Sequence, residues 1–236
     1  KYYSVDHQYD SVNAARRAKL PLPEPEPASQ DIVLASKEMV EAVEALFDQF
    51  PSFSDDFPSV FEMESLKDPH LWWYHCRTTF KIQDLPDRQA QLVAVLIDWI
   101  ESNFAQLYDQ IDDQFRRGKV SSESLKFLIR PGDVLVAKRN GTYSGRIATG
   151  RPLPQAMDKR SEETEKNSER LGDQSWVVRT RSYGYAGKFF RVDKEVSIDF
   201  PSKYSGTEID ISELNTMPPS YAKPELKETL LQRGKR

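Results

Sequence analysis

Hydrophobic positions in the first half of the chain recur with the 3.6-residue period of an α-helix. Residues 36–50 form an apolar stripe at positions i, i+1, i+4, i+7, i+8 and i+11. Ser36 stands where a helix N-cap is expected, and Pro51 follows the last apolar position. We therefore predict a helix over residues 36–50. Its stripe consists of Met39, Val40, Val43, Leu46, Phe47 and Phe50.

A longer helical pattern covers residues 85–119. Arg116 and Arg117 suit the negative end of the helix dipole, and Gly118 is suited to ending the helix. A short helix is expected next, at 122–128. The apolar positions predicted to share one face of the long helix are Leu92, Val95, Leu96, Trp99, Ile100, Phe104, Leu107, Ile111 and Phe115.

The segment between these two helices is rich in proline and in aromatic residues. It is too apolar to be disordered and too often interrupted to form a long element. We expect an irregular segment whose aromatic side chains pack onto the helices, namely those of Phe53, Phe57, Phe61, Trp72 and Trp73.

The pattern changes to short strands after residue 129. Pro131 must end the preceding helix, and Gly132 suits the position of a type II turn where φ is positive. Asp133 can then bond back to the amides of that turn. Asn140-Gly141 is a strong hairpin signal between the strands expected at 133–138 and 142–149. Three further strands are expected at 175–182, 187–192 and 195–200.

These elements predict an α+β fold, in which a helical N-terminal part packs on a small twisted antiparallel sheet or partial β-barrel. The boundaries that we expect are a disordered Pro-Glu-rich tail at 1–30, a helical region at 31–128, a β domain at 129–222 with a mobile charged insert at 155–173, and a helix at 223–236 that begins near Pro224.

Composition adds the class of protein. No run of about 18 apolar residues is present, so we expect no transmembrane span. The single cysteine, Cys76, fits a reducing compartment, and we expect an intracellular protein of the cytoplasm or nucleus. Because the chain begins at Lys1 and not at methionine, we expect it to be part of a longer protein.

The net charge of −4 conceals an asymmetry along the chain. Residues 1–121 carry 12 Lys and Arg against 21 Asp and Glu, a net charge of −9. Residues 122–236 carry 21 against 16, a net charge of +5. This asymmetry is explained either by an acidic helical part beside a basic β part, or by a basic surface that binds nucleic acid or another acidic partner.

One stretch resembles a phosphate-binding loop but lacks its chemistry. Gly145 and Gly150 have the spacing of a Walker A motif, yet Arg151 and Pro152 stand where Lys and Ser or Thr should contact the phosphates and Mg²⁺. We expect the two glycines to serve a bend in a strand and the chain to bind no nucleotide there.

No catalytic or metal-binding set of residues emerges from the sequence. His70, His75 and Cys76 lie close together, but no second pair of ligands accompanies them. The histidines do not combine with a serine or cysteine into a recognisable triad. We therefore expect no catalytic residues, no cofactor-binding residues and no metal site in this chain.

Basic and aromatic residues alternate on the strands near residues 176–191. Such a pattern can bind single-stranded nucleic acid through stacking and charge. In a small antiparallel sheet, however, the aromatic residues usually form the core and the arginines a solvated face, and we favour this second interpretation. The residues of this candidate partner surface are Arg179, Arg181, Lys188 and Arg191.

The order of motifs in residues 122–236 resembles an uncharacterised domain that precedes the ATPase module of fungal AAA+ proteins. The matching stretches are "LKFLIRPGDVLV", "SWVVRTRSYGY", "KFFRVDKEVSIDF", "YSGTEIDISELNTMPPSYA" and "ELKETLLQRGKR". Ala186-Gly187 replaces the usual Asp-Gly turn, and "IDISEL" contains one additional residue.

The resemblance implies a function that the residues alone do not indicate. A AAA+ module with its own Walker A motif would follow Arg236, and ATP and Mg²⁺ would bind there. This chain would be the non-catalytic N-terminal domain, which binds or positions a protein substrate or adaptor for the motor. A nucleic-acid-binding module and a structural assembly domain are the alternatives. Steep salt dependence of binding would favour nucleic acid.

Overall fold

The computed structural model describes residues 31–57, 60, 65–139, 141–155, 174–200 and 208–234. The chain divides into two compact units, the first running to Ala105 and the second beginning at Gln106. This division lies within a helix and not at the change in sequence pattern near residue 129. The tail expected at 1–30 lies outside the described residues, as does the insert expected at 155–173 apart from Gln155.

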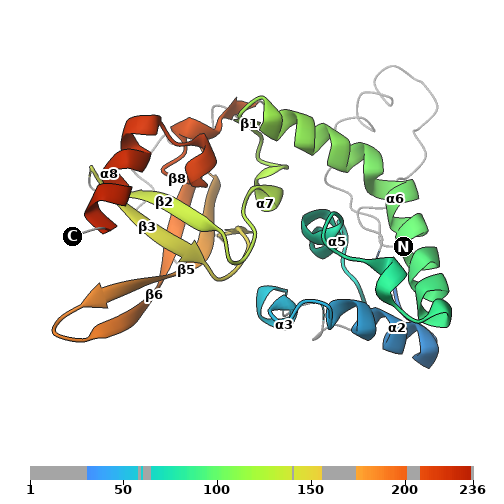
Figure 1. Ribbon diagram of the computed structural model, residues 1–236. Coiled ribbons are helices and arrows are strands. Elements are labelled where there is room, and N and C mark those ends of the chain that lie inside the picture. The colour runs from blue at the N-terminus through green and yellow to red at the C-terminus, as the bar shows by residue number, and fades with distance from the viewer. Residues whose placement is uncertain are drawn as a thin grey trace, which may run out of the picture. The chain divides into compact units, whose positions relative to one another are not determined.

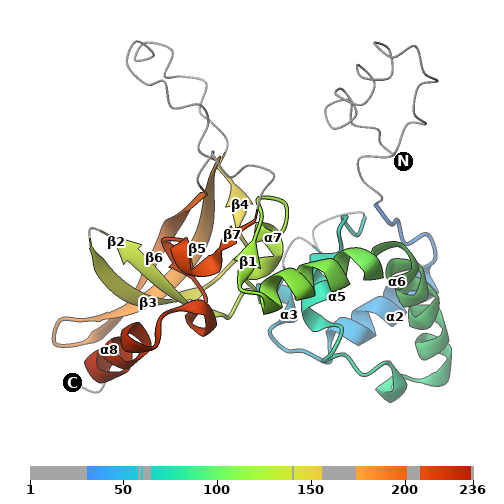
Figure 2. The same cartoon turned by 90° about the horizontal axis from the view of Figure 1, so that it is seen from above.

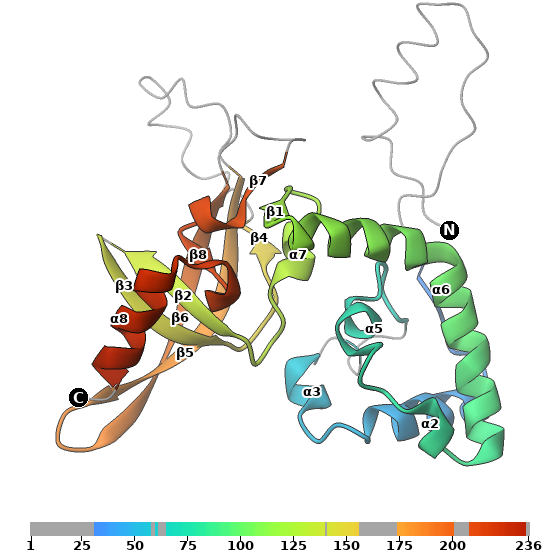
Figure 3. The ribbon, with the colours of Figure 1, turned by 45° about the horizontal axis from the view of Figure 1, so that its top comes forward.

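In the first unit, the elements with described bounds are four helices and one 3₁₀ turn. They are α2 (Lys37–Phe47), α3 (Phe53–Asp56), α5 (Leu71–Cys76), η1 (Ile82–Asp84) and the first part of α6 (Asp87–Arg116). Figure 3 shows α2, α3 and α5 gathered beside the first part of α6. The Ser36 hydroxyl accepts a hydrogen bond from the Met39 N–H at 3.1 Å, which confirms the predicted N-cap of α2.

Aromatic side chains fill the core of this unit. Phe47 stacks on Phe53 with ring centroids 4.2 Å apart, and Trp72 meets Phe47 edge-on at 5.2 Å. Phe57 and Trp73 are also buried, so four of the five aromatic residues predicted to pack here do so. The fifth, Phe61, lies outside the described residues. Such ring pairs stabilise a core by about 0.5–1.5 kcal/mol each beyond the burial of their area.

The buried face of α6 differs from the predicted one. Val95 is 65% exposed, and Trp99 and Leu107 are each 37% exposed, so their assignment to the buried face was wrong. The true face is rotated and includes a tyrosine that the apolar pattern did not count. Its buried residues are Val93, Leu96, Ile97, Ile100, Phe104, Tyr108 and Ile111.

The second unit is built on a curled antiparallel sheet. Its strands are β2 (Val134–Arg139), β3 (Thr142–Ala148), β4 (Leu153–Pro154), β5 (Gln174–Tyr185), β6 (Phe189–Phe200) and β8 (Thr216–Met217). They run in the order β4-β5-β3-β2-β8, and β6 pairs with β5. Figure 2 shows the sheet curling into a half-barrel. The predicted α+β fold class is therefore confirmed.

Smaller elements complete the second unit. β1 (Lys119–Val120) pairs with β7 (Ile209–Asp210), and α7 (Leu125–Leu128) lies between β1 and β2 in the chain. After β7 come η3 (Ile211–Glu213), η4 (Pro219–Tyr221) and α8 (Pro224–Gly234). Helix α8 lies beside β3 (Figures 1 and 2), and Pro224 is its first residue, as predicted.

The junction of α7 and β2 has the predicted turn. Gly132 has a φ of 89°, and the Asp133 N–H donates to the Arg130 carbonyl at 3.1 Å. The Asp133 carboxylate accepts a hydrogen bond from the Arg130 N–H at 2.8 Å. Pro131, which lies between these two residues in the sequence, is buried. Burial raises the pKa of Asp133, and the hydrogen bond from Arg130 opposes this effect.

The turn between β2 and β3 lies at the predicted place. Gly141 has a φ of 75°, as a tight hairpin turn requires, whereas Asn140 lies outside the described residues. Arg139 pairs with Thr142 at the end of the ladder.

The strands predicted at 187–192 and 195–200 are one strand. β6 runs unbroken over twelve residues and pairs with the full length of β5. The charged stretch around Asp193 was mistaken for a break, but its residues are exposed positions of a continuous strand.

Side chains bridge the gap between β6 and β8. Asn215 donates to the Asp199 carboxylate at 2.7 Å and accepts from the Asp199 N–H at 3.1 Å. The Thr216 hydroxyl donates to the Ser197 carbonyl at 3.2 Å. These bonds hold the two borders of the half-barrel together at one end.

Candidate functional site

The β5–β6 hairpin is the longest ladder in the described residues. Twelve residue pairs run from Gln174 with Phe200 to Tyr185 with Phe189. Gly187, with a φ of 77°, lies in the turn that joins the strands. Figure 1 shows the closed end of the hairpin extending past the neighbouring strands, so that this end is a two-stranded ribbon.

Four aromatic side chains near this turn are exposed, and we call them the aromatic tip. Tyr183 is 62% exposed, Tyr185 68%, Phe189 80% and Phe190 49%. The rings of Tyr185 and Phe189 pair across the strands with centroids 5.1 Å apart. The interpretation of these aromatic residues as core was therefore wrong for the tip, although Trp176 is buried as expected.

Gly184 makes room for one of these rings. The Phe190 ring lies directly over Gly184, so that a Cβ added there would be 2.5 Å from the ring. Because Gly184 and Phe190 form a cross-strand pair, the glycine sets the position of the ring on its face of the ribbon.

The four basic residues of the candidate partner surface all lie on this hairpin, and two of them are paired. Arg179 meets the Glu195 carboxylate at 3.5 Å, and Arg191 meets that of Asp193 at 2.8 Å. Lys188 is exposed in the turn and forms no ion pair with a described residue. The Arg181 Nε is buried and has no hydrogen-bond partner among the described residues.

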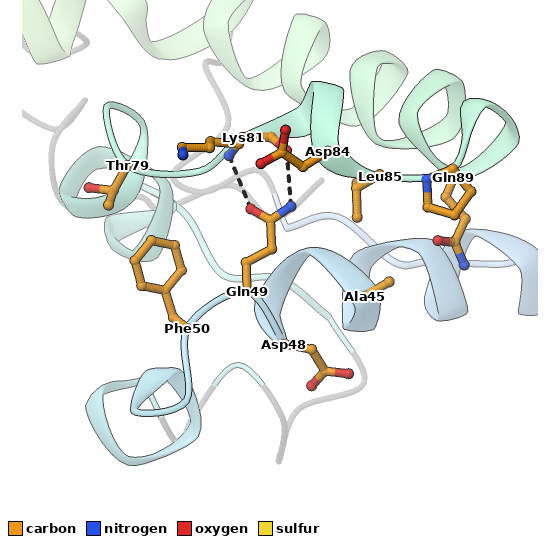
Figure 4. Close-up of a pocket in the computed structure, with 10 residues that line it drawn as sticks. Ala45, Asp48, Gln49, Phe50, Thr79, Lys81, Asp84, Leu85 and Gln89 are labelled. Carbon is orange, nitrogen blue, oxygen red and sulfur yellow. Dashed lines mark hydrogen bonds between the residues drawn. The ribbon is translucent and has the colours of Figure 1, made fainter.

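A second candidate site is a depression of about 670 Å³ in the first unit (Figure 4). The Gln49 amide donates to the Lys81 carbonyl at 2.9 Å and accepts from the Lys81 N–H at 3.0 Å. Figure 4 shows these two bonds joining the end of α2 to the segment that precedes α6. Because Gln49 is held in this way, its role here is structural.

The glycines of the Walker-like stretch lie at the end of a strand. Gly145 is within β3 and pairs with Val136, and Gly150 follows β3. The Thr149 N–H between them donates to the Arg179 carbonyl at 2.8 Å. The element that follows Gly150 is the strand β4 and not a helix, so the geometry differs from that of a phosphate-binding loop.

The cluster of His70, His75 and Cys76 lies in and next to α5. Among the described residues, no group of three or more His, Cys, Asp or Glu side chains is arranged to hold a metal ion. Cys76 is buried. His70 is fully buried at a φ of 53°, its ring meets that of Phe104 edge-on at 5.0 Å, and neither ring nitrogen has a hydrogen-bond partner among the described residues.

The electrostatic environment of His70 is unfavourable for a proton. Burial lowers the pKa of the imidazole from 6.5 to about 4, and the nearby Asp31 carboxylate opposes this shift. Asp31 itself has a lowered pKa, chiefly because it accepts a hydrogen bond from the Lys67 ammonium.

The aromatic tip was the functional feature that sequence reasoning missed. The sequence analysis assigned these aromatic residues to the core, and the alternation of the strands gave no sign that they are exposed at the tip. The signal that could have found the tip is the length over which β5 and β6 pair beyond the end of the β3–β5 pairing. β3 pairs with β5 at Arg181 and Thr180, so the tip residues lie beyond that pairing.

In the part of the chain that the structure describes, no helix has the length and hydrophobicity needed to span a membrane.

Comparison with known protein families matched residues 110–223 to a domain of unknown function, DUF7025. No curated protein and no solved structure matched the chain. Residues 110–223, which hold the hairpin and the half-barrel, are thus similar to a domain family without an assigned function.

Proposed function

We propose that this chain is a non-catalytic region of a AAA+ ATPase, in which the aromatic tip binds a protein substrate or adaptor and positions it for the motor. The observation that carries the proposal is the exposure of Tyr183, Tyr185, Phe189 and Phe190 at the end of a projecting ribbon. Exposed aromatic groups of this kind mark interaction surfaces and dominate binding energies in protein interfaces.

The connection with a motor comes from the resemblance of residues 122–236 to the domain that precedes fungal AAA+ modules. In this proposal, ATP and Mg²⁺ bind to a module that follows Arg236, and the hairpin delivers the bound protein to it. The half-barrel provides a rigid base for the hairpin, because the buried half of β5 and β6 belongs to its core. The core residues from these two strands are Trp176, Val178, Ile198 and Phe200.

Charge on the hairpin favours a protein over nucleic acid. Arg179 and Arg191 are opposed by carboxylates on the same ribbon, so their attraction for phosphate is reduced. A surface that combines exposed aromatic rings with charges of both signs suits a polypeptide. Binding to single-stranded nucleic acid is the alternative outcome of the test.

The test measures binding of residues 1–236 to a fluorescein-labelled, permanently unfolded model polypeptide by fluorescence anisotropy. We expect saturable binding that is weakened at least about tenfold when Tyr185 and Phe189 are both replaced by serine, because buried aromatic anchors carry most of the affinity. The matched control is Leu153→Ser, because Leu153 is 49% exposed on β4, away from the tip.

Two results would contradict the proposal. The first is equal affinity of the parent chain and the double variant for the polypeptide. The second is tighter binding to a labelled oligothymidylate with a steep loss of affinity as salt increases, which would assign the tip to nucleic acid.

A further inference from the structure

The concave side of the half-barrel contains a small polar pocket that the proposed function does not use. Its volume is about 340 Å³, near the lower end of the range for ligand sites of roughly 300–1,000 Å³. It is a space for one small group and not for a nucleotide. The side chains from which the argument is built are Lys138, Ser144, Arg146, Lys194, Glu195 and Asn215.

The strand register places Arg146 on the inner face of the sheet. Arg146 pairs with Leu135, which is fully buried, and Ala148, two residues further along β3, is also buried. Side chains at alternate positions and in directly opposed pairs share a face. The guanidinium therefore projects from the same face as the hydrophobic core.

Lys194 lines the same pocket from β6, which pairs with β5 on the side opposite to β3. It pairs with Thr180, which is 1% exposed and faces the core, so Lys194 belongs to the inner face of β6. Its ammonium forms no ion pair with a described residue. Two cations, from strands that are separated only by β5, thus line one pocket.

The pocket has more positive than negative charge. Arg146 and Lys194 are its cations on the inner face. Lys138 and Glu195 also line the pocket, but both belong to the other face of the sheet: the Lys138 ammonium lies 5.7 Å from the centre of the Tyr143 ring, and the Glu195 carboxylate meets Arg179. Asn215 is held by Asp199 through two hydrogen bonds. The inner face therefore brings two cations to the pocket and no carboxylate of the pocket lining.

One donor of Arg146, a residue of the pocket lining, lacks an acceptor. Nη1 of Arg146 is buried and has no hydrogen-bond partner among the described residues. A buried donor without an acceptor is costly, and a charged donor is more costly still. Arginine matches planar or tetrahedral oxyanions with parallel N–H groups, and hydrogen bonds between opposite charges are the strongest that proteins form.

We propose that this pocket binds a single oxyanion group, a phosphate or a carboxylate, between Arg146 and Lys194. Ser144 supplies a hydroxyl from the strand that carries Arg146. The group enters as a free anion or on the side chain of a bound peptide, and the pocket accepts one such group at a time because of its volume.

The test follows the side-chain Nε–Hε signal of Arg146 and the backbone amide signals of residues 144–146 and 194–196 by NMR during titration of residues 1–236 with inorganic phosphate at constant ionic strength. We expect saturable shifts in these signals. Arg146→Gln and Lys194→Gln should each weaken the binding roughly tenfold, as loss of a charge-assisted hydrogen bond does. Lys223→Gln removes the same charge outside the pocket and should leave the binding unchanged.

The variants also separate binding from folding. Lys194 is exposed, so Lys194→Gln leaves the core intact even if Arg146→Gln destabilises the half-barrel. Shifts that grow linearly with phosphate, or an equal effect of Lys194→Gln and Lys223→Gln, would overturn the proposal. Parallel titrations with phosphoserine and aspartate peptides identify the source, because a peptide-borne group binds more tightly than inorganic phosphate only if the peptide is the carrier.

Discussion

The turn that leads from α7 into β2 is the part of the fold that the sequence predicts most reliably, because its conformation depends on single residues. Pro131, Gly132 and Asp133 each have a distinct stereochemical role, and these roles do not depend on the rest of the fold. The structure has the expected positive φ at Gly132 and the expected bond from Arg130 to Asp133. Backbone chemistry of this kind is local, so the sequence predicts it well.

Replacement of Gly132 by valine tests this turn. A Cβ at Gly132 would meet no atom within 4 Å, so the cost arises from the φ of 89° and not from a clash. We expect Gly132→Val to lower the free energy of unfolding by roughly 1–3 kcal/mol. Urea unfolding midpoints, compared at equal slopes, measure the loss.

The control for this prediction is Gly145→Val. Gly145 lies in β3 without a positive φ, and a Cβ there also meets no atom within 4 Å. Its replacement should cost less than that of Gly132. If the two variants have the same midpoint, backbone strain at Gly132 is not the cause and the turn assignment is wrong.

At the scale of elements, the sequence predicted most helices and strands but not their buried faces. α6 was predicted within three residues at each end, yet the choice of face failed. Its apolar residues nearly surround the helix, and the pattern alone gives no direction. Tyr108, fully buried, was left out because tyrosine was not counted among the apolar positions.

Two valines on α6 allow a matched test of this face. Val93 is fully buried and Val95 is 65% exposed, although both belong to the same turn of the same helix. We expect Val93→Ala to cost roughly 2 kcal/mol through lost burial and a cavity, and Val95→Ala to be neutral within about 0.5 kcal/mol. Chemical denaturation of both variants measures the difference. Equal costs would show that Val95 is covered in solution.

The candidate site was predicted only in part. The structure has Arg179, Arg181, Lys188 and Arg191 on one ribbon, and their role as a partner surface stays a prediction. The exposure of the aromatic tip could not be predicted, because it depends on how far β3 extends beside β5. Arg146 was missed for a similar reason, since only the register shows that an arginine shares a face with the core.

At the scale of the whole molecule, acid affects the free energy of unfolding of the two units differently. His70 lies in the first unit, and its pKa in the folded state is about 4 instead of 6.5. The unfolded chain therefore binds a proton more readily than the folded one between these values. The free energy of unfolding is highest above pH 6.5 and falls as the pH drops toward 4.

We expect the first unit to lose about 2–3 kcal/mol of stability between pH 6.5 and pH 4. Asp31 adds a further loss below this range, as the pH falls from the ordinary carboxyl pKa of 3.8 through its lowered value in the folded state. Tryptophan fluorescence in urea titrations at several pH values reports this unit once Trp176 of the second unit is replaced by phenylalanine, because Trp72, Trp73 and Trp99 then remain. His70→Leu should flatten the profile; a profile that stays as steep would locate the acid sensitivity elsewhere.

The hairpin also has a consequence for the behaviour of the protein at high concentration. A ribbon that carries exposed aromatic rings and an open strand edge tends to pair with its own copies. Residues 179–195 hold five basic residues and two acidic ones, a net charge of +3, so two tips that approach each other repel. Because salt screens this repulsion within about 10 Å at 0.1 M, self-association and loss of solubility increase with ionic strength.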